Sequence, residues 1–216
     1  MEDQVRAVRR HAVSALGSAL RELVDAAVRT EVSVTKLEVA TEAARRLAIR
    51  LRAESRGVQD PPSVDDPATG ERAYSPVYGP GSPIAPPLVA THTEDGRATG
   101  HVTLGPAHEG PPGVVHGGVV AAMFDHMLAR AVRAGGRSGL TATLTVTYRR
   151  PVRLGVPLLL TAKLVDADGR RTTARARLVA EDDPGTTLAE ADGLFVTQRP
   201  DVTPDDFSPA RLDDDA

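Results

Sequence analysis

The spacing of apolar side chains divides the chain into a helical N-terminal part and a strand-rich remainder. Along residues 1–56 apolar side chains recur every three or four positions, which predicts a long helix and a second helix that starts near Thr35. Thr35 and Glu38 have the spacing of a capping box. We expect a helical hairpin that serves packing or oligomerisation. The alternative, an arm that binds a membrane surface or a partner, is weakened by the acidic residues interspersed among the basic ones.

Two polar segments bound the remainder of the chain. Residues 57–70 are rich in Pro, Asp and Gly, a composition typical of a linker. Residues 200–216 are strongly acidic and are expected to form a disordered tail. We therefore expect an N-terminal helical extension at 1–56, a linker at 57–70 and one globular domain at 71–199.

The pattern within 71–199 predicts two short strands, a helix and then four strands. The first strands, 87–93 and 97–104, are joined at Asp95–Gly96, a dipeptide suited to a tight hairpin. Residues 141–148 alternate with period two. Thr141, Thr143, Thr145 and Thr147 are therefore expected on one face, and Ala142, Leu144, Val146 and Tyr148 on the other. The last three strands should form a meander: 157–166, 170–181 and 186–198, with turns at Asp168–Gly169 and Pro184–Gly185.

The predicted helix follows a Pro/Gly-rich turn in the stretch EGPPGVVHGGVVAAMFDHMLA, residues 109–129. A helix that is apolar on nearly all sides must be covered by other elements. This predicts an α+β fold of the hot-dog type, an antiparallel β-sheet wrapped around one long helix. Such a sheet has open edges, so we expect at least a dimer. Asp125 is a lone carboxylate inside this helix, and charged groups in such places are usually paired or functional.

Composition narrows the function classes. A formal net charge of -3 argues against a general nucleic-acid binder. With no cysteine and no His/acid cluster at ligand spacing, neither a disulfide nor a metal site is expected. No apolar run reaches the roughly 18 residues that span a bilayer, and the N-terminus lacks the apolar centre of a signal peptide. We therefore expect a cytoplasmic protein without membrane association.

Three segments together resemble a known family. EGPPGVVHGGVVAAMFD, then TATLTVTYRRPV, then LAEADGLFV are similar to the hot-dog acyl-CoA thioesterases of the group that includes phenylacetyl-CoA thioesterase (PaaI) and thioesterase superfamily member four. The resemblance covers about residues 71–199. His-Gly-Gly with an Asp nine positions after the His is fairly specific, and EGPPG and TYRRP bring the chain nearer to the member-four type.

The resemblance implies hydrolysis of an acyl-CoA, with a medium- or long-chain fatty acyl group or an aromatic one, and no cofactor beyond the CoA of the substrate. A carrier-protein thioester stays open. Two alternatives remain: a non-catalytic acyl-CoA-binding or scaffold protein, and a dehydratase or hydratase acting on acyl thioesters. The last fits poorly, because those families place an acid shortly after a PGV-like turn and the residue four positions after Gly113 is Gly117.

Thioester hydrolysis needs an oxyanion donor, a base or nucleophile, and a group that orients water. Amides at a helix N-terminus are unpaired and lie at the positive end of the helix dipole, so the Gly117 amide is the candidate oxyanion donor. Gly118, which also lacks a Cβ, allows close approach of the substrate. Asp125 is the candidate general base or nucleophile, and Thr141, aligned with the family's Ser or Thr, is expected to hold the water or the carboxylate.

The remaining candidates support these groups. His116 is expected to fix the turn more than to act on the substrate. Many relatives place Asn or Gln six residues before this His, where this chain has Gly110, so Glu109 or the main chain is expected to take over that role. The basic cluster at a strand end, Arg149, Arg150 and Arg153, is a candidate site for the CoA phosphates, with simple solvent exposure as the alternative.

The spacing of Gly117 and Asp125 predicts composite sites. Eight residues at ~1.5 Å per residue place the two groups ~12 Å apart along one helix, too far to act on a single carbonyl. We therefore expect that Asp125 of one subunit faces the helix N-terminus of another subunit, and the resemblance implies the same homo-oligomeric arrangement.

Overall fold

The computed structural model describes residues 2–65 and 70–197. These residues fall into two compact units. The first contains the chain up to Val89 with the segments Val102–His116 and Arg153–Val156, and the second contains Ala90–His101, Gly117–Val152 and the chain from Pro157 onwards. The borders expected at residues 56, 70 and 199 stay a prediction, and the acidic tail, residues 200–216, lies outside the described residues.

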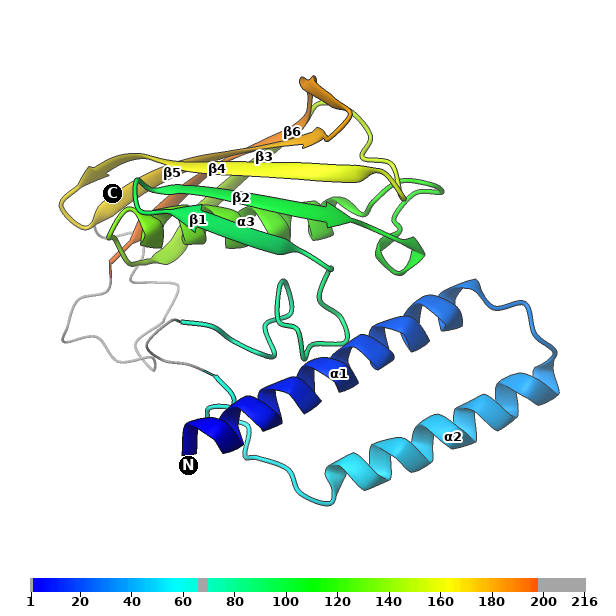
Figure 1. The fold of residues 1–216 in the computed structure, drawn as a ribbon. Coiled ribbons are helices and arrows are strands. Elements are labelled where there is room, and N and C mark those ends of the chain that lie inside the picture. The colour runs from blue at the N-terminus through cyan, green and yellow to red at the C-terminus, as the bar shows by residue number, and fades with distance from the viewer. Residues whose placement is uncertain (1, 66–69, 198–216) are drawn as a thin grey trace, which may run out of the picture. The chain divides into compact units, whose positions relative to one another are not determined.

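The first unit contains the two predicted N-terminal helices, α1 (Glu2–Arg29) and α2 (Val34–Arg52), which run in opposite directions (Figure 1). One side of α1 packs on the chain around Pro80. Arg21 donates hydrogen bonds to the carbonyl oxygens of Pro80 and Ser82 at 2.9 and 2.8 Å, and a Cβ at Gly17 would lie 2.3 Å from the Pro80 oxygen. In contrast, α2 buries none of its residues.

The capping box expected at Thr35 is not formed. Helix α2 starts at Val34, and Ser33, with an extended backbone, occupies the N-cap position without a side-chain hydrogen bond. Thr35 is therefore already inside the first turn, where its hydroxyl cannot serve as the cap of this helix.

The second unit is built around one long helix, α3 (Gly117–Ala134), which lies along one face of the sheet (Figure 1). The antiparallel pairs and the order β1-β2-β4-β5-β6-β3 confirm the α+β hot-dog fold and its final meander. Strands β3 and β1 form the two edges of the sheet. The strands are β1 (Val89–Thr93), β2 (Arg97–Thr103), β3 (Leu140–Tyr148), β4 (Pro157–Asp168), β5 (Arg171–Ala180) and β6 (Asp183–Val196).

The core of this unit lies between α3 and the inner face of the sheet. Helix residues Met123, Phe124, Met127 and Leu128 have no exposed surface, and the same is true of strand residues Leu158, Leu160 and Leu178. Complete burial of each such side chain contributes about 1.5–3 kcal/mol. The helix that carries Asp125 is therefore held rigidly by its packing against the sheet.

Most predicted turns are present, and one is wrong. Gly96 and Gly169 have positive φ angles of 78° and 51°, as the two predicted hairpins require. The turn expected at Pro184–Gly185 instead lies at Glu181 and Asp182, because β6 already begins at Asp183. The pairing of β5 and β6 shifts register there, so the Pro and Gly are accommodated in an irregular strand end.

Candidate active site

Asp125 and Thr141 come together where α3 passes the edge strand β3. The hydroxyl Oγ1 of Thr141 donates a hydrogen bond to Oδ1 of Asp125 at 2.7 Å. Asp125 is half-buried and Thr141 is exposed, so the pair lies at the border between core and solvent. Arg130, five residues further along α3, makes no ion pair with Asp125 among the described residues, and its Nε has no hydrogen-bond partner there. The carboxylate is thus oriented by a neutral hydroxyl and keeps access to solvent.

A β-bulge gives Thr141 this orientation. Thr141 pairs with Phe195, but Thr143 pairs with the very next residue, Leu194, so Ala142 is the extra residue of the bulge. Phe195 is buried against α3, and Thr141 shares its face of the sheet. The expectation that Thr141 lies on the same face as Thr143 is therefore wrong. Bulges commonly re-aim side chains next to active sites.

The N-terminus of α3 is held by an aromatic residue that the sequence did not single out. Tyr148, at the end of β3, donates a hydrogen bond from its hydroxyl to the carbonyl oxygen of Gly117 at 2.7 Å. A Cβ on Gly117 would approach the Tyr148 ring to 3.3 Å, so glycine permits this close packing. Gly117 is the first residue of α3, as expected for the oxyanion donor, and both Gly117 and Gly118 lie in its first turn. In the sequence, Tyr148 stands at the end of the alternating stretch 141–148 and within the TYRRP motif, and neither feature indicates a bond to Gly117.

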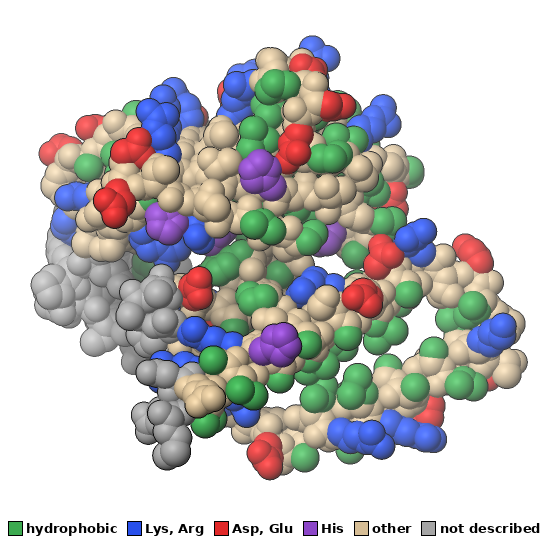
Figure 2. Space-filling model, in the orientation of Figure 1, with side chains coloured by type: hydrophobic (Ala, Val, Ile, Leu, Met, Phe, Trp, Pro, Cys, Tyr) green, Lys and Arg blue, Asp and Glu red, His purple; other side chains and the backbone are tan. Residues whose placement is uncertain are grey.

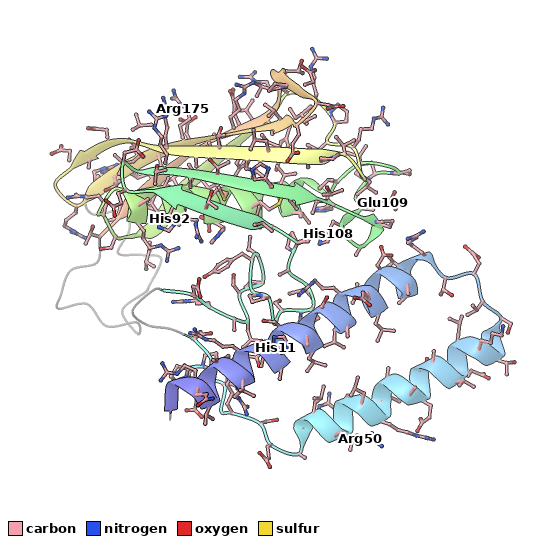
Figure 3. The ribbon with its side chains drawn as sticks, viewed as in Figure 1. His11, Arg50, His92, His108, Glu109 and Arg175 are labelled. Carbon is pink, nitrogen blue, oxygen red and sulfur yellow. The ribbon has the colours of Figure 1, made fainter. Side chains whose placement is uncertain are left out.

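The turn before α3 belongs to the first unit and is held by hydrogen bonds among its own residues. Oε1 of Glu109 accepts a hydrogen bond from the Gly113 amide at 2.7 Å, and Gly113 has a positive φ of 73°. The backbone of Glu109 also bridges to Val115. Figure 3 labels Glu109 and His108 in this segment. In the structure Glu109 therefore ties the turn together, and its suggested role in accepting a hydrogen bond from water stays a prediction.

Gly110 occupies a place where no side chain fits. A Cβ at residue 110 would lie 2.9 Å from the Cα of His116, a backbone contact that real structures avoid. The amide of Gly110 donates to the Val114 oxygen, and the amide of His116 donates to the His108 oxygen, each at 2.9 Å. This tight double closure leaves room only for glycine at position 110. The side chain of His116 is exposed.

The three candidate arginines are not equivalent. Arg149 forms an ion pair with Glu190, and its Nε lies 3.1 Å from the Glu190 Oε1. Arg150 is exposed, and no hydrogen bond or ion pair of its side chain occurs within the described part of the chain. Arg153 is exposed in the first unit, where its backbone bridges to Val114. Of the three, Arg150 has the side chain that is most available for an external anion.

His126 follows Asp125 in the helix but belongs to the core. Burial, together with the nearby positive charges of Arg130 and Arg133, lowers its pKa from 6.5 to about 4. It is therefore neutral at pH 7, whereas the Asp125 carboxylate accepts a hydrogen bond from Thr141 at the border of the core. In the described segments no three His, Asp or Glu side chains are grouped so that they could hold a metal ion. No helix of those segments has the length and apolar character needed to cross a bilayer.

The second unit holds two groups whose chemistry suits hydrolysis. One is an oriented carboxylate paired with a hydroxyl, which suits a base or a nucleophile. The other is a glycine at a helix N-terminus, where amides lie at the positive end of the dipole and stabilise developing negative charge. Both parts lie in the second unit, separated by eight residues of one helix.

Comparisons with known proteins agree with this chemistry. The family model described as "Thioesterase superfamily" matches residues 112–187, which include both parts of the site. A solved crystal structure of a thioesterase superfamily protein is 38% identical, covers 85% of this chain and 94% of its own, and superposes with a TM-score of 0.76.

Curated relatives match a shorter segment. The acyl-coenzyme A thioesterase THEM4 of Xenopus laevis is 38% identical over 93 residues, which are 43% of this chain and 41% of that protein. The protein of the same name from Bos taurus is 32% identical over 97 residues, 45% of this chain and 39% of its own. The chain thus spans about two fifths of the length of the curated relatives it matches.

Proposed function

The chain belongs to the thioesterase superfamily, and we propose that it hydrolyses acyl-CoA to a free acid and CoA. The observation that carries the proposal is the Asp125–Thr141 hydrogen bond at the border of the core, on the helix whose first residue is Gly117. The names of the curated relatives support acyl-CoA as the substrate. The acyl group is a medium- or long-chain fatty acyl group, with an aromatic group as the alternative, and the reaction takes place in the cytoplasm.

In the proposed reaction Asp125 acts as a general base. It removes a proton from a water molecule that Thr141 helps to position, and the water oxygen forms a bond to the thioester carbon. The negative charge that develops on the carbonyl oxygen is stabilised by the Gly117 amide. When the tetrahedral intermediate collapses, the carbon–sulfur bond breaks and the CoA sulfur receives the proton held by Asp125. The carboxylate is thereby restored.

If Asp125 acts instead as a nucleophile, the oxygen that the released acid gains can come from the Asp125 carboxylate. Its carboxylate would bond to the acyl carbon, CoA would leave, and water would then hydrolyse the anhydride. Single-turnover hydrolysis in ¹⁸O-labelled water separates the two routes. General-base catalysis places ¹⁸O in the acid released in the first turnover, whereas attack by Asp125 on the acyl group, followed by water attack on the Asp carbonyl, transfers an unlabelled oxygen to the acid.

Release of free CoA thiol tests the proposed function directly. We expect release from at least one acyl-CoA in a series of short, medium, long and aromatic acyl groups. Asp125→Asn and Asp125→Ala should lower kcat by at least about a hundredfold, because removing a general base costs 10²–10⁴ in rate. Asp168→Asn, which removes a carboxylate from a hairpin end, is the control and should leave kcat unchanged. A protein that binds acyl-CoA but releases no thiol in the whole series is a binding or scaffold protein instead.

We further propose that each active site combines two chains. The ~12 Å between Gly117 and Asp125 along α3 prevents both groups of one chain from acting on one carbonyl. Within the residues that the structure describes, the edge strand β3 carries Thr141 and pairs with β6 alone, so it leaves an open edge beside the Asp125–Thr141 pair. A second copy of the chain at this edge would bring its own helix N-terminus to the pair.

Complementation between two inactive variants tests this arrangement. Asp125→Asn lacks the base, and Gly117→Pro lacks the donating amide. In a mixed dimer, one of the two composite sites takes Gly117 from the first variant and Asp125 from the second and is therefore intact. We expect activity to return on mixing and subunit exchange, up to half per mixed dimer. If mixing restores no activity although mass spectrometry shows mixed dimers, each site lies within one chain.

Arginines at the end of β3 extend the proposal to CoA recognition. Arg150 has an exposed side chain and Arg149 precedes it in the second unit, so these two are proposed to bind the CoA phosphates. Arg153 belongs to the first unit and stays a candidate from the sequence alone. Arg150→Gln should then raise KM for acyl-CoA and leave kcat nearly unchanged. The arginine already paired with Glu190, Arg149, should contribute less than Arg150.

A further inference from the structure

The outer face of the sheet, turned away from α3, carries a group of cations on three neighbouring strands. Arg97 on β2, Lys163 on β4 and both Arg175 and Arg177 on β5 are exposed. Their immediate neighbours in sequence, Ala98, Ala162 and Ala176, are buried, so the strands point these cations to the opposite face from the core. Figure 3 shows Arg175 projecting from the side of the sheet away from α3, and Figure 2 shows Lys and Arg side chains on that surface.

These side chains line one groove of about 310 Å³. Two hydroxyl residues, Thr99 and Thr161, stand between the cations, and no acidic residue is among those that line the groove. The volume lies at the lower end of the range of small-molecule sites, about 300–1,000 Å³. The groove therefore offers cationic and hydroxyl donors, and it lies within the second unit alone.

The strand register places like charges opposite one another. Lys163 on β4 pairs with Arg175 on β5, and Thr161 pairs with Arg177. Side chains of directly opposed residues start about 4.5–5.5 Å apart, and like charges at such positions are destabilising. A protein that places Lys opposite Arg at the floor of a groove gains stability when an anion occupies the space between them.

Carboxylates of the protein neutralise this group only in part. Nε of Arg97 lies 2.9 Å from Asp95, and Nε of Arg175 lies 2.8 Å from Asp192. Arg177 donates a hydrogen bond to a backbone carbonyl, that of Pro184, and Lys163 forms no ion pair within the described residues. A third carboxylate, Glu190 on β6, lies opposite Arg177 and is shared with Arg149. Four cations thus face three carboxylates, all of them outside the groove lining.

We propose that this groove binds a small anion with phosphate groups, such as the diphosphate of a nucleotide. Guanidinium groups match the geometry of phosphate oxygens, and Lys and Thr add further donors. The groove lies on the opposite face of the sheet from the Asp125–Thr141 pair, so it is a second site that does not depend on the proposed hydrolysis. Two sources share this chemistry: free phosphate compounds and the nucleotide end of CoA.

Calorimetric titration of the full chain at low ionic strength tests the proposal with three probes, inorganic pyrophosphate, ADP and CoA. We expect pyrophosphate and ADP to bind wild-type protein. Lys163→Gln should weaken binding about tenfold, because a charge-assisted hydrogen bond is lost, and Lys163→Gln with Arg177→Gln should abolish it. The matched control is Arg171→Gln on the same strand β5, which removes one exposed positive charge outside the groove and should leave binding unchanged.

Thermal unfolding supplies a second readout that also checks folding of the variants. Without anion, Lys163→Gln should be at least as stable as wild type, because it removes the like-charge pair with Arg175. Pyrophosphate should raise the Tm of wild type and of Arg171→Gln, but not that of the double variant. CoA binding that disappears in the double variant would identify the nucleotide end of CoA as one source of the anion.

Several results overturn the proposal. The first is that neither pyrophosphate nor ADP binds to the wild-type protein. The second is that Arg171→Gln weakens anion binding as much as Lys163→Gln does. The third is that the double variant binds the anions as tightly as wild type. Binding of CoA alone also overturns it, because the shared phosphate chemistry would then not carry the interaction. None of these results depends on thioesterase activity, so failure of this proposal and failure of the proposed function are distinguishable.

Discussion

Tyr148 connects the two chemical parts of the site at the scale of single residues. Its strand also carries Thr141, which holds Asp125, and its own hydroxyl is bonded to the carbonyl of Gly117. The side chain is 50% exposed, so the hydroxyl makes this bond at the surface of the unit, beside the helix N-terminus. Tyr148 is therefore placed to fix the position of the Gly117 peptide relative to β3.

Tyr148→Phe isolates this hydrogen bond, because the ring and its contact with Gly117 are retained. We expect a loss of about 1 kcal/mol in the free energy of unfolding, measured by urea denaturation. Thiol release should show a lower kcat with little change in KM, because an oxyanion donor that is less well fixed stabilises the transition state less. Tyr74→Phe, at an exposed tyrosine of the first unit, is the control. If the two variants have the same free energy of unfolding and the same kcat, the Tyr148 hydroxyl does not fix the Gly117 peptide.

At the scale of elements, the turn from His108 to His116 is closed too tightly for any side chain at residue 110. A Cβ atom added to Gly110 would lie 2.9 Å from the Cα of His116. Gly110→Ala should therefore destabilise the protein by about 1–3 kcal/mol, the range of overpacking. Gly185→Ala is the matched control, because its Cβ would meet no atom closer than 3.7 Å. A Gly110→Ala variant with unchanged Tm would show that the turn can open at no cost.

The elements themselves could largely be predicted from local pattern. Strict alternation defines β3 to within one residue, and the apolar spacing defines α1 and α3. Two features could not be predicted, because they arise from pairing between strands. The bulge at Ala142 depends on the register of β3 against β6, and the start of β6 at Asp183 depends on its register against β5.

In the candidate site, too, some features follow from local sequence and others depend on contacts between distant residues. Asp125 and Gly117 could be proposed as candidates because a carboxylate in an apolar helix and a glycine pair at a helix start are visible in the sequence. Their hydrogen bonds to Thr141 and Tyr148 required three-dimensional information. Thr141 was identified only through its alignment with the family's Ser or Thr, and the bond between Tyr148 and Gly117 joins residues 31 positions apart. The tight fit at Gly110 likewise results from the approach of the His116 backbone.

For the whole molecule, the buried histidine on α3 makes stability depend on pH. In the folded protein the pKa of His126 is about 4, lowered chiefly by burial and further by Arg130 and Arg133, whereas the unfolded chain has the ordinary value near 6.5. Between these two values the unfolded state binds more protons than the folded state, so stability falls as pH falls. The stability that His126 contributes in its neutral form is fully present above pH 6.5 and is lost by about pH 4. Burial also lowers the pKa of His108, so its contribution has the same sign.

Urea denaturation from pH 7.5 to 4 should therefore show a decrease in the free energy of unfolding of up to about 3 kcal/mol from His126, since one pKa unit corresponds to 1.36 kcal/mol. His126→Gln should make the free energy of unfolding depend less steeply on pH between 6.5 and 4, because the variant has no group to protonate at that position. This holds whatever the effect of the substitution on stability at pH 7.5. His92→Gln removes an exposed histidine on β1 and should keep the wild-type slope. If His126→Gln retains the full pH dependence, protonation of the α3 histidine is not what destabilises the core in acid, and the carboxylates must account for it.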